Sequence, residues 1–155
     1  MAYMDVEFPD DFMQELLGAD FDTIAEDALK EATDELVKAM KTSCKNSIDH
    51  EGDSELANSI RASKPKKTAD GAWIVNVGPR GYSKKKTYYG KNGKGVHTGR
   101  KYPVSNALKA IWKEYGIPGR QSAKPFIQKA VNDSKASVEK KLQDIYDRKV
   151  GNNGP

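Results

Sequence analysis

The sequence predicts an α+β fold, in which a long N-terminal helix and two C-terminal helices pack on a small antiparallel β-sheet. Apolar residues recur at every fourth position after residue 24, which is typical of an amphipathic helix. Extended segments on both sides of Asp70-Gly71 are typical of a β-hairpin. With 155 residues, the chain is long enough for one domain with one modest core. We expect that domain to span residues 21–149, between an acidic N-terminal arm (1–20) and a flexible tail (150–155).

The first helix is predicted from a cap and a periodic apolar face. Thr23 and Glu26 have the spacing of a capping box, so we expect the helix to begin there and to run for about five turns. Its apolar face is formed by Ile24, Ala28, Ala32, Leu36 and Met40, with Leu29 and Val37 alongside. In the preceding arm, a smaller apolar face suited to docking on a neighbouring molecule is formed by Phe8, Phe12, Leu16 and Leu17.

The middle of the chain predicts strands. After a short turn capped by Asp53 or Ser54, we expect two antiparallel strands over about residues 59–66 and 72–78. Pro65 lacks an N–H group, which favours an edge position for the first strand. Residues 79–103 contain five glycines and predict a long basic loop, extended over 80–103, or a hairpin with Thr87-Tyr88-Tyr89 in one arm.

Two helices are predicted to complete the domain. Ser105 caps the first, and Gly116 ends it. The second begins near Ala123–Pro125, because proline is tolerated in a first turn. The apolar residues of the first are Ala107, Leu108, Ile111, Trp112 and Tyr115. For Trp112 and Tyr115 we expect a place in the core or at an interface rather than in base stacking.

Charge is distributed unevenly along the chain. Residues 1–35 hold twelve Asp or Glu residues and one Lys, a net charge of −11. Residues 80–101 hold eight basic residues and no acidic one, a net charge of +8. These are Arg80, Lys84, Lys85, Lys86, Lys91, Lys94, Arg100 and Lys101. Three interpretations stay open: solvated surfaces, acidic and basic zones that meet across copies in an assembly, or a basic loop that faces nucleic acid.

No pattern in the sequence indicates a catalytic, cofactor or metal site. His50 and His97 are far apart and lack a metal-ligand spacing. "DHEGD" (49–53) lacks the glycine position and distal Glu of a calcium loop, and "GKNGKG" (90–95) lacks the Gly-Lys-Ser/Thr of a phosphate loop. Cys44 stands alone and is expected to be buried. We therefore expect no enzyme and no cofactor; no apolar run has the roughly 18 residues that would span a membrane.

Three sets of residues, in a fixed order, resemble the neck or tail-completion proteins of long-tailed bacteriophages, a group that includes head–tail joining and minor tail proteins. The first is the helix "IAEDALKEATDELVKAMKTS". The second is "GDSELANSIRAS" followed by the strand "AWIVNVGP". The third is "WKEYGIPGRQSAKPFIQKAV" (112–131), in which an aromatic residue precedes a glycine, a short loop follows, and Pro-Phe opens an apolar helix. The resemblance spans about residues 24–147; the basic insertion at 80–101 and the acidic arm depart from the family pattern.

This resemblance implies a structural virion protein at the head–tail junction, made in the cytoplasm of a bacterial host. Copies would form a sixfold or twelvefold ring that joins the head connector or head-closure protein to the tail tube or tail terminator and surrounds the DNA exit channel. The third motif would form a packing joint, with structural or interface roles for Trp112, Tyr115, Gly116, Pro125 and Phe126. The alternative is an accessory protein that binds nucleic acid through the basic loop 80–101.

Overall fold

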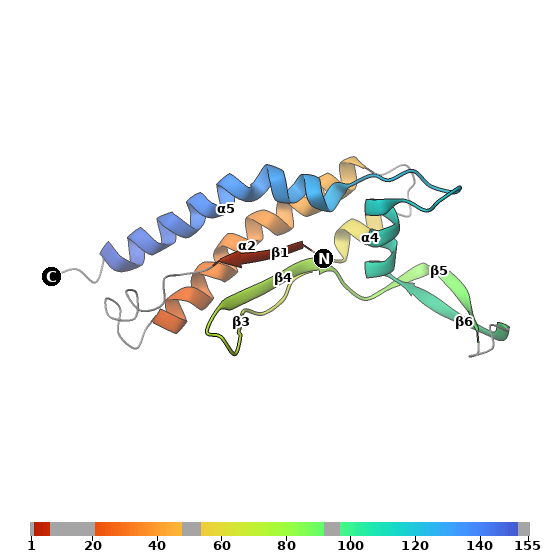
Figure 1. Cartoon of the computed structure of the whole chain (residues 1–155), viewed down its shortest axis with the longest axis horizontal. Helices are drawn as coiled ribbons and strands as arrows, with labels where there is room; N and C mark the ends of the chain where they lie inside the picture. The colour runs from red at the N-terminus through yellow and green to blue at the C-terminus, as the bar shows by residue number, and fades with distance from the viewer. Residues whose placement is uncertain (1, 7–20, 48–53, 92–96, 152–155) are drawn as a thin grey trace.

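The computed structural model describes residues 2–6, 21–47, 54–91 and 97–151, and it has the predicted α+β architecture (Figure 1). The helices are α2 (Phe21–Asn46), α3 (Ser54–Asn58), α4 (Asn106–Tyr115) and α5 (Phe126–Gly151). The strands are β1 (Ala2–Val6), β2 (Ile60–Ala62), β3 (Lys66–Lys67), β4 (Trp73–Pro79), β5 (Tyr82–Lys91) and β6 (His97–Ser105). The arm residues 7–20, including the predicted apolar face, lie outside the described residues.

The two 26-residue helices α2 and α5 run side by side in opposite directions above the sheet (Figure 1). Ion pairs across their surface join Arg148 to Glu31 at 3.2 Å and Lys149 to Asp27 at 3.9 Å. The chain is already helical at Phe21, so the capping box predicted at Thr23 is wrong. The helix has about seven turns rather than five because the 3.6-residue pattern extends in both directions beyond its most regular part.

The larger sheet is centred on β4. β1 pairs with one side of β4, from Ala2 opposite Val77 to Val6 opposite Trp73, whereas β2 and β3 pair with the other side. The predicted hairpin at Asp70-Gly71 is confirmed: Thr68 N donates to Ala72 O at 2.8 Å, and Gly71 has φ 90°. β1 was not predicted, because the arm that contains it is acidic and lacks a turn signal.

The core lies between the sheet and the helix pair. Alternate residues of β4, Val75 and Val77, are buried under the helices, as the alternation predicts. They meet a cluster contributed by the four helices and by β2, which includes Leu29, Leu36, Met40, Cys44, Leu56, Ile60, Ala110, Phe126 and Val138. Cys44 is fully buried, as expected.

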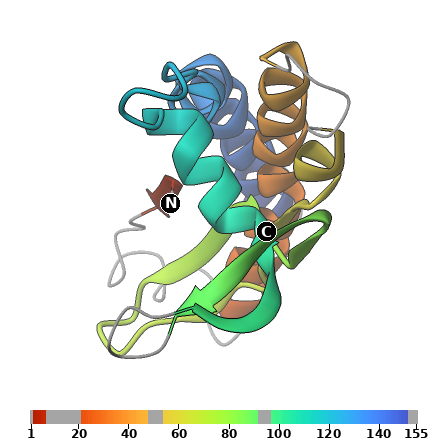
Figure 2. The ribbon, with the colours of Figure 1, turned by 90° about the vertical axis from the view of Figure 1, so that its right-hand side faces the viewer.

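The basic segment is a hairpin, the second of the two predicted alternatives. β5 and β6 pair only with each other, from Tyr82 opposite Ser105 to Lys91 opposite His97. Figures 1 and 2 show this hairpin projecting from the body next to α4. Since an isolated two-stranded hairpin is at best marginally stable in water, its attachment to the body matters for its conformation.

The ends of α4 follow the prediction closely. Ser105 Oγ accepts a hydrogen bond from Leu108 N at 3.1 Å, and Gly116, with φ 77°, terminates the helix. α5 begins at Phe126, so Pro125 precedes the helix instead of lying in its first turn. α5 continues to Gly151, two residues into the segment predicted as a tail, and residues 152–155 lie outside the described residues.

Phe126 is 1% exposed and is among the largest fully buried side chains of the described chain. We predict that Phe126→Ala lowers the free energy of unfolding by about 3–5 kcal/mol, because the cavity left in the core adds to the lost burial. Urea denaturation followed by circular dichroism measures this loss. Tyr115→Ala is the matched control: its side chain is 76% exposed, so a change within about 0.5 kcal/mol is expected. A loss below 1 kcal/mol for Phe126→Ala would show that the ring is no core anchor.

Candidate functional site

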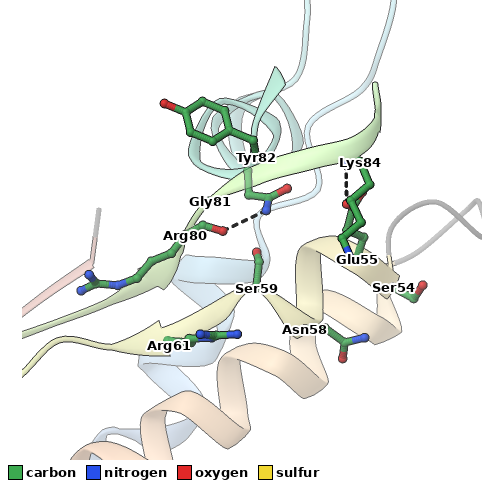
Figure 3. Close-up of a pocket in the computed structure, with 10 residues that line it drawn as sticks. Ser54, Glu55, Asn58, Ser59, Arg61, Arg80, Gly81, Tyr82 and Lys84 are labelled. Atoms are coloured by element: carbon green, nitrogen blue, oxygen red, sulfur yellow. Dashed lines mark hydrogen bonds between the residues drawn. The ribbon is translucent and has the colours of Figure 1, made fainter. Parts of the chain in front are cut away.

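The carboxylate of Glu55 joins the hairpin to the body. Glu55 lies on α3, and its oxygens accept hydrogen bonds from Lys84 N at 2.6 Å (Figure 3) and from Ser83 Oγ at 2.9 Å. Lys109 Nζ of α4 lies 3.4 Å from Glu55 Oε2, with the Lys109 side chain only 5% exposed. One carboxylate thus fixes three elements, α3, β5 and α4, relative to each other.

These donors lower the pKa of Glu55 below its ordinary value of 4.5. The backbone N–H of Lys84 has the largest effect, the hydroxyl of Ser83 and the ammonium of Lys109 add to it, and partial burial opposes all three. The charged form is therefore the stable form in the folded protein.

An irregularity in β5 places these donors. Between the pair Tyr82–Ser105 and the pair Thr87–Pro103, β5 advances five residues while β6 advances two. The extra residues bulge out of the ladder, as in other strand bulges, and turn Ser83 inward, where it is 3% exposed. Gly81, with φ 75°, precedes the bulge, and its carbonyl accepts a hydrogen bond from Asn106 N at 2.9 Å.

The predicted basic residues lie on or beside the hairpin. Arg80, Lys84, Arg100 and Lys101 are exposed. Lys85, Lys86 and Lys91 occupy positions on β5 whose side chains are not described, and Lys94 lies outside the described residues. Arg61, which the sequence analysis did not select, joins Arg80, Tyr82 and Lys84 around an open cavity of about 580 Å³ (Figure 3). The described part of the hairpin is therefore a basic projection with Tyr82 at its base and Tyr102 further along it.

Helix α4 is turned opposite to the expected orientation. Its buried residues are mostly polar: Asn106, Lys109, Lys113 and Glu114, together with Ala110. Two of its large apolar residues face outward instead, with Ile111 50% and Tyr115 76% exposed, while Leu108 and Trp112 are half-buried. The alternative of a core position for Tyr115 is therefore wrong, because polar partners inside the protein determine which face of α4 is buried.

Those polar partners belong to the joint between α4 and α5. The carboxylate of Glu114 accepts hydrogen bonds from Ile127 N at 2.8 Å and from Gln128 N at 3.0 Å. Both donors are free N–H groups of the first turn of α5, where the helix dipole favours a negative charge. Lys124 N also donates to Lys113 O at 2.7 Å. The end of α4 thus caps the start of α5.

The loop between these helices is closed by its own backbone. Ile117 and Gln121 exchange hydrogen bonds at 2.8 and 2.9 Å. A Cβ at Gly116 would lie 2.7 Å from Gln121 O and 2.8 Å from Ala123 N, so only glycine fits. Together with Pro125 and the buried Phe126, this geometry supports the interpretation of residues 112–131 as a packing joint.

The described residues contain no group of three metal-ligating side chains, and none of the described helices is long and apolar enough to cross a membrane. Glu55, which lines the cavity beside the hairpin, already accepts a hydrogen bond from a backbone N–H group, and so does the buried Glu114. What the surface offers is apolar and basic contact area. Such a surface is suited to binding a macromolecule.

Sequence reasoning missed the residues that organise this surface, Glu55, Lys109 and Glu114. Glu55 lies within "GDSELANSI", where its position in the second motif is a usable signal. Glu114 and its partner Ile127 both lie within the third motif, which is a similar signal. Lys109 gives none, because it lies outside the three motifs and its partner Glu55 is 54 residues away along the chain.

We predict that Glu55→Gln removes part of the acid sensitivity of the fold. Because the pKa of Glu55 is lower in the folded state, its charge stabilises the fold above pH 4.5, and this contribution is lost as the pH falls through the folded-state pKa. Urea midpoints measured from pH 7 to pH 3 should therefore converge for variant and wild type at the acid end. The control is Glu139→Gln, whose exposed carboxylate lies 4.0 Å from Lys135 and contributes little. If the urea midpoints of Glu55→Gln and wild type differed by the same amount at every pH, the charge of Glu55 would not be what stabilises the fold.

Comparison with known proteins gives one match. Residues 10–116 match the family model described as "Bacteriophage HK97-gp10, putative tail-component". The matched range runs from before α2 through the hairpin to the end of α4, and so includes the first two resembling motifs and ends inside the third. No curated protein and no solved structure matches the chain. Since the match covers more than half of the chain, the protein belongs to the HK97-gp10-like family of bacteriophage tail components and has a structural role in the viral tail.

Proposed function

We propose that this protein acts in the phage neck, where copies form a ring, sixfold or twelvefold, that joins the head connector to the tail tube and surrounds the DNA exit channel. Membership of a tail-component family carries the proposal. A structural part of this kind performs its function by contact, and we propose no catalysis. Its partners would be further copies of itself, the head-closure or connector protein and the tail tube or tail terminator.

The two unlike ends of the molecule support a ring. One end carries α4 with its outward apolar residues and the basic hairpin; the other carries the start of α2 and the end of α5 (Figure 1). In a ring each copy presents one surface to a different surface of the next, so unlike ends are what such an assembly needs. A contact in which both copies use the same surface would instead give a closed dimer.

The exposed basic residues Lys84, Arg100 and Lys101 suit either of two places in such a ring. They could contact an acidic neighbour or approach the phosphate backbone of DNA passing through the channel. The same residues carry the second candidate function, an accessory nucleic-acid-binding protein that acts through residues 80–101.

We predict that gold-labelled antibody against this protein binds phage particles at one point between head and tail, as seen by electron microscopy. Particles from a phage lacking the gene, complemented with an unrelated tail protein, serve as the negative control. Purified protein should leave free DNA unshifted at physiological salt. Unlabelled particles, together with a DNA shift that weakens steeply as salt rises, would instead favour the accessory function.

A further inference from the structure

The outward face of α4 is an apolar stripe in an unusual place. Ala107, Ile111 and Tyr115 are exposed and follow each other at four-residue spacing, so they lie along one side of the helix. The exposed large hydrophobic residues of the described chain are Tyr82, Tyr102, Ile111 and Tyr115. All four lie on α4 or the neighbouring hairpin, so exposed apolar surface is concentrated at one end of the molecule (Figure 2). Concentration of this kind marks an interaction surface.

A cleft of about 330 Å³ adjoins this stripe. Its walls are the end of β4 (Val77, Gly78, Pro79), the stripe residue Ile111, and Ile127 at the start of α5. Asn76 also lines the cleft, and its buried Oδ1 accepts no hydrogen bond from the described residues.

The apolar stripe cannot turn inward without breaking polar contacts. Rotation of α4 would remove Glu114 from the first turn of α5 and Lys109 from Glu55. Each contact involves a charged group that is largely buried, and leaving such a group unpaired costs several kcal/mol. The stripe and the cleft are therefore built to face outward.

We propose that this cleft, here called the α4 cleft, receives residues 7–20 of a neighbouring copy. Their sequence, "EFPDDFMQELLGAD", contains five acidic residues, no basic one and five large apolar residues. The α4 cleft offers the complement: an apolar floor, with the exposed Arg80 on its wall and the basic hairpin beside it. Apolar contact would supply affinity, and opposite charge would select the partner.

The positions of the residues that flank the 7–20 segment favour binding to the α4 cleft of a neighbouring copy over binding to the cleft of the same chain. Val6 pairs with Trp73, whose Nε1 donates to Asp22 Oδ1 at 3.2 Å, so both ends of the 7–20 segment lie near Trp73. The α4 cleft is lined by the second half of β4, from Asn76 to Pro79, about 10 to 20 Å from Trp73. A segment of 14 residues held at both ends reaches at most about 24 Å, and then only with its turn. A neighbouring copy can present the whole segment, in a head-to-tail contact that closes into a ring.

This inference rests on the proposed self-assembly and identifies its contact. It is tested with a fluorescent peptide of residues 7–20 and a full-length acceptor in which Phe8, Phe12, Leu16 and Leu17 are changed to serine. Fluorescence polarisation should show saturable binding that weakens as salt rises. Adding Ile111→Glu to the acceptor should weaken binding about tenfold or more, whereas Ile111→Leu should change it less than about threefold. A peptide with its residues in scrambled order should not bind.

Circular dichroism and thermal unfolding must first show that each acceptor is folded, and Tyr115→Glu provides a second charged variant at a more exposed position. Absence of peptide binding, or equal binding to Ile111→Glu, overturns the proposal. Binding of a single-stranded oligonucleotide that Ile111→Glu abolishes, without peptide binding, would assign the cleft to nucleic acid and also overturn it. Particles that still carry the Ile111→Glu protein at the neck would refute the α4 cleft as the contact and leave the proposed neck function intact.

Discussion

The carboxylate of Glu114 determines how the two C-terminal helices meet. It is 8% exposed and accepts hydrogen bonds from two N–H groups of the first turn of α5. Burying a carboxylate is costly, and charge-assisted hydrogen bonds to otherwise unpaired N–H groups offset that cost only in one geometry. Once Glu114 points at α5, the rest of α4 is oriented: Lys109 faces Glu55, and Ile111 and Tyr115 face solvent. The α4 cleft and its apolar stripe follow from this one contact.

The sequence predicted the parts of the fold that local chemistry controls. Ser105 and Gly116 mark the ends of α4 because capping and left-handed backbone need those residue types. Asp70-Gly71 predicted the turn before β4 for the same reason. Phe126, to which the resemblance gave a structural or interface role, is buried in the core.

What failed depended on partners distant in the chain. Tyr115 belongs to an apolar pattern that usually marks a buried face, yet buried partners of Lys109 and Glu114 turn that face outward. β1 forms because the edge of β4 offers backbone hydrogen bonds. The five residues of β1 carry no sequence pattern that predicts this pairing. The bulge in β5 likewise goes with the hydrogen bonds that Glu55 accepts from Ser83 and Lys84, which are 28 and 29 residues away in the chain. The role of the basic residues and the identity of their partner stay predictions.

These features divide the molecule into a body and a contact end. The antiparallel pair α2 and α5 covers the sheet and holds most of the core, whereas α4 and the hairpin add exposed apolar and basic surface (Figure 1). Glu55 and Glu114 fix the contact end to the body at two points. A rigid attachment of this kind would lower the entropy lost in the proposed assembly, since the surface proposed to bind the next copy is organised beforehand.

The proposed contact between copies is tested most directly by a side-chain-resolution electron cryo-microscopy map of the neck in intact particles. The account predicts a ring of copies in which Ile111 and Tyr115 of each copy are covered by the next, while Glu114 still caps α5. A ring in which this face of α4 is exposed to solvent, or in which α4 has rotated to bury it within its own chain, would contradict the account.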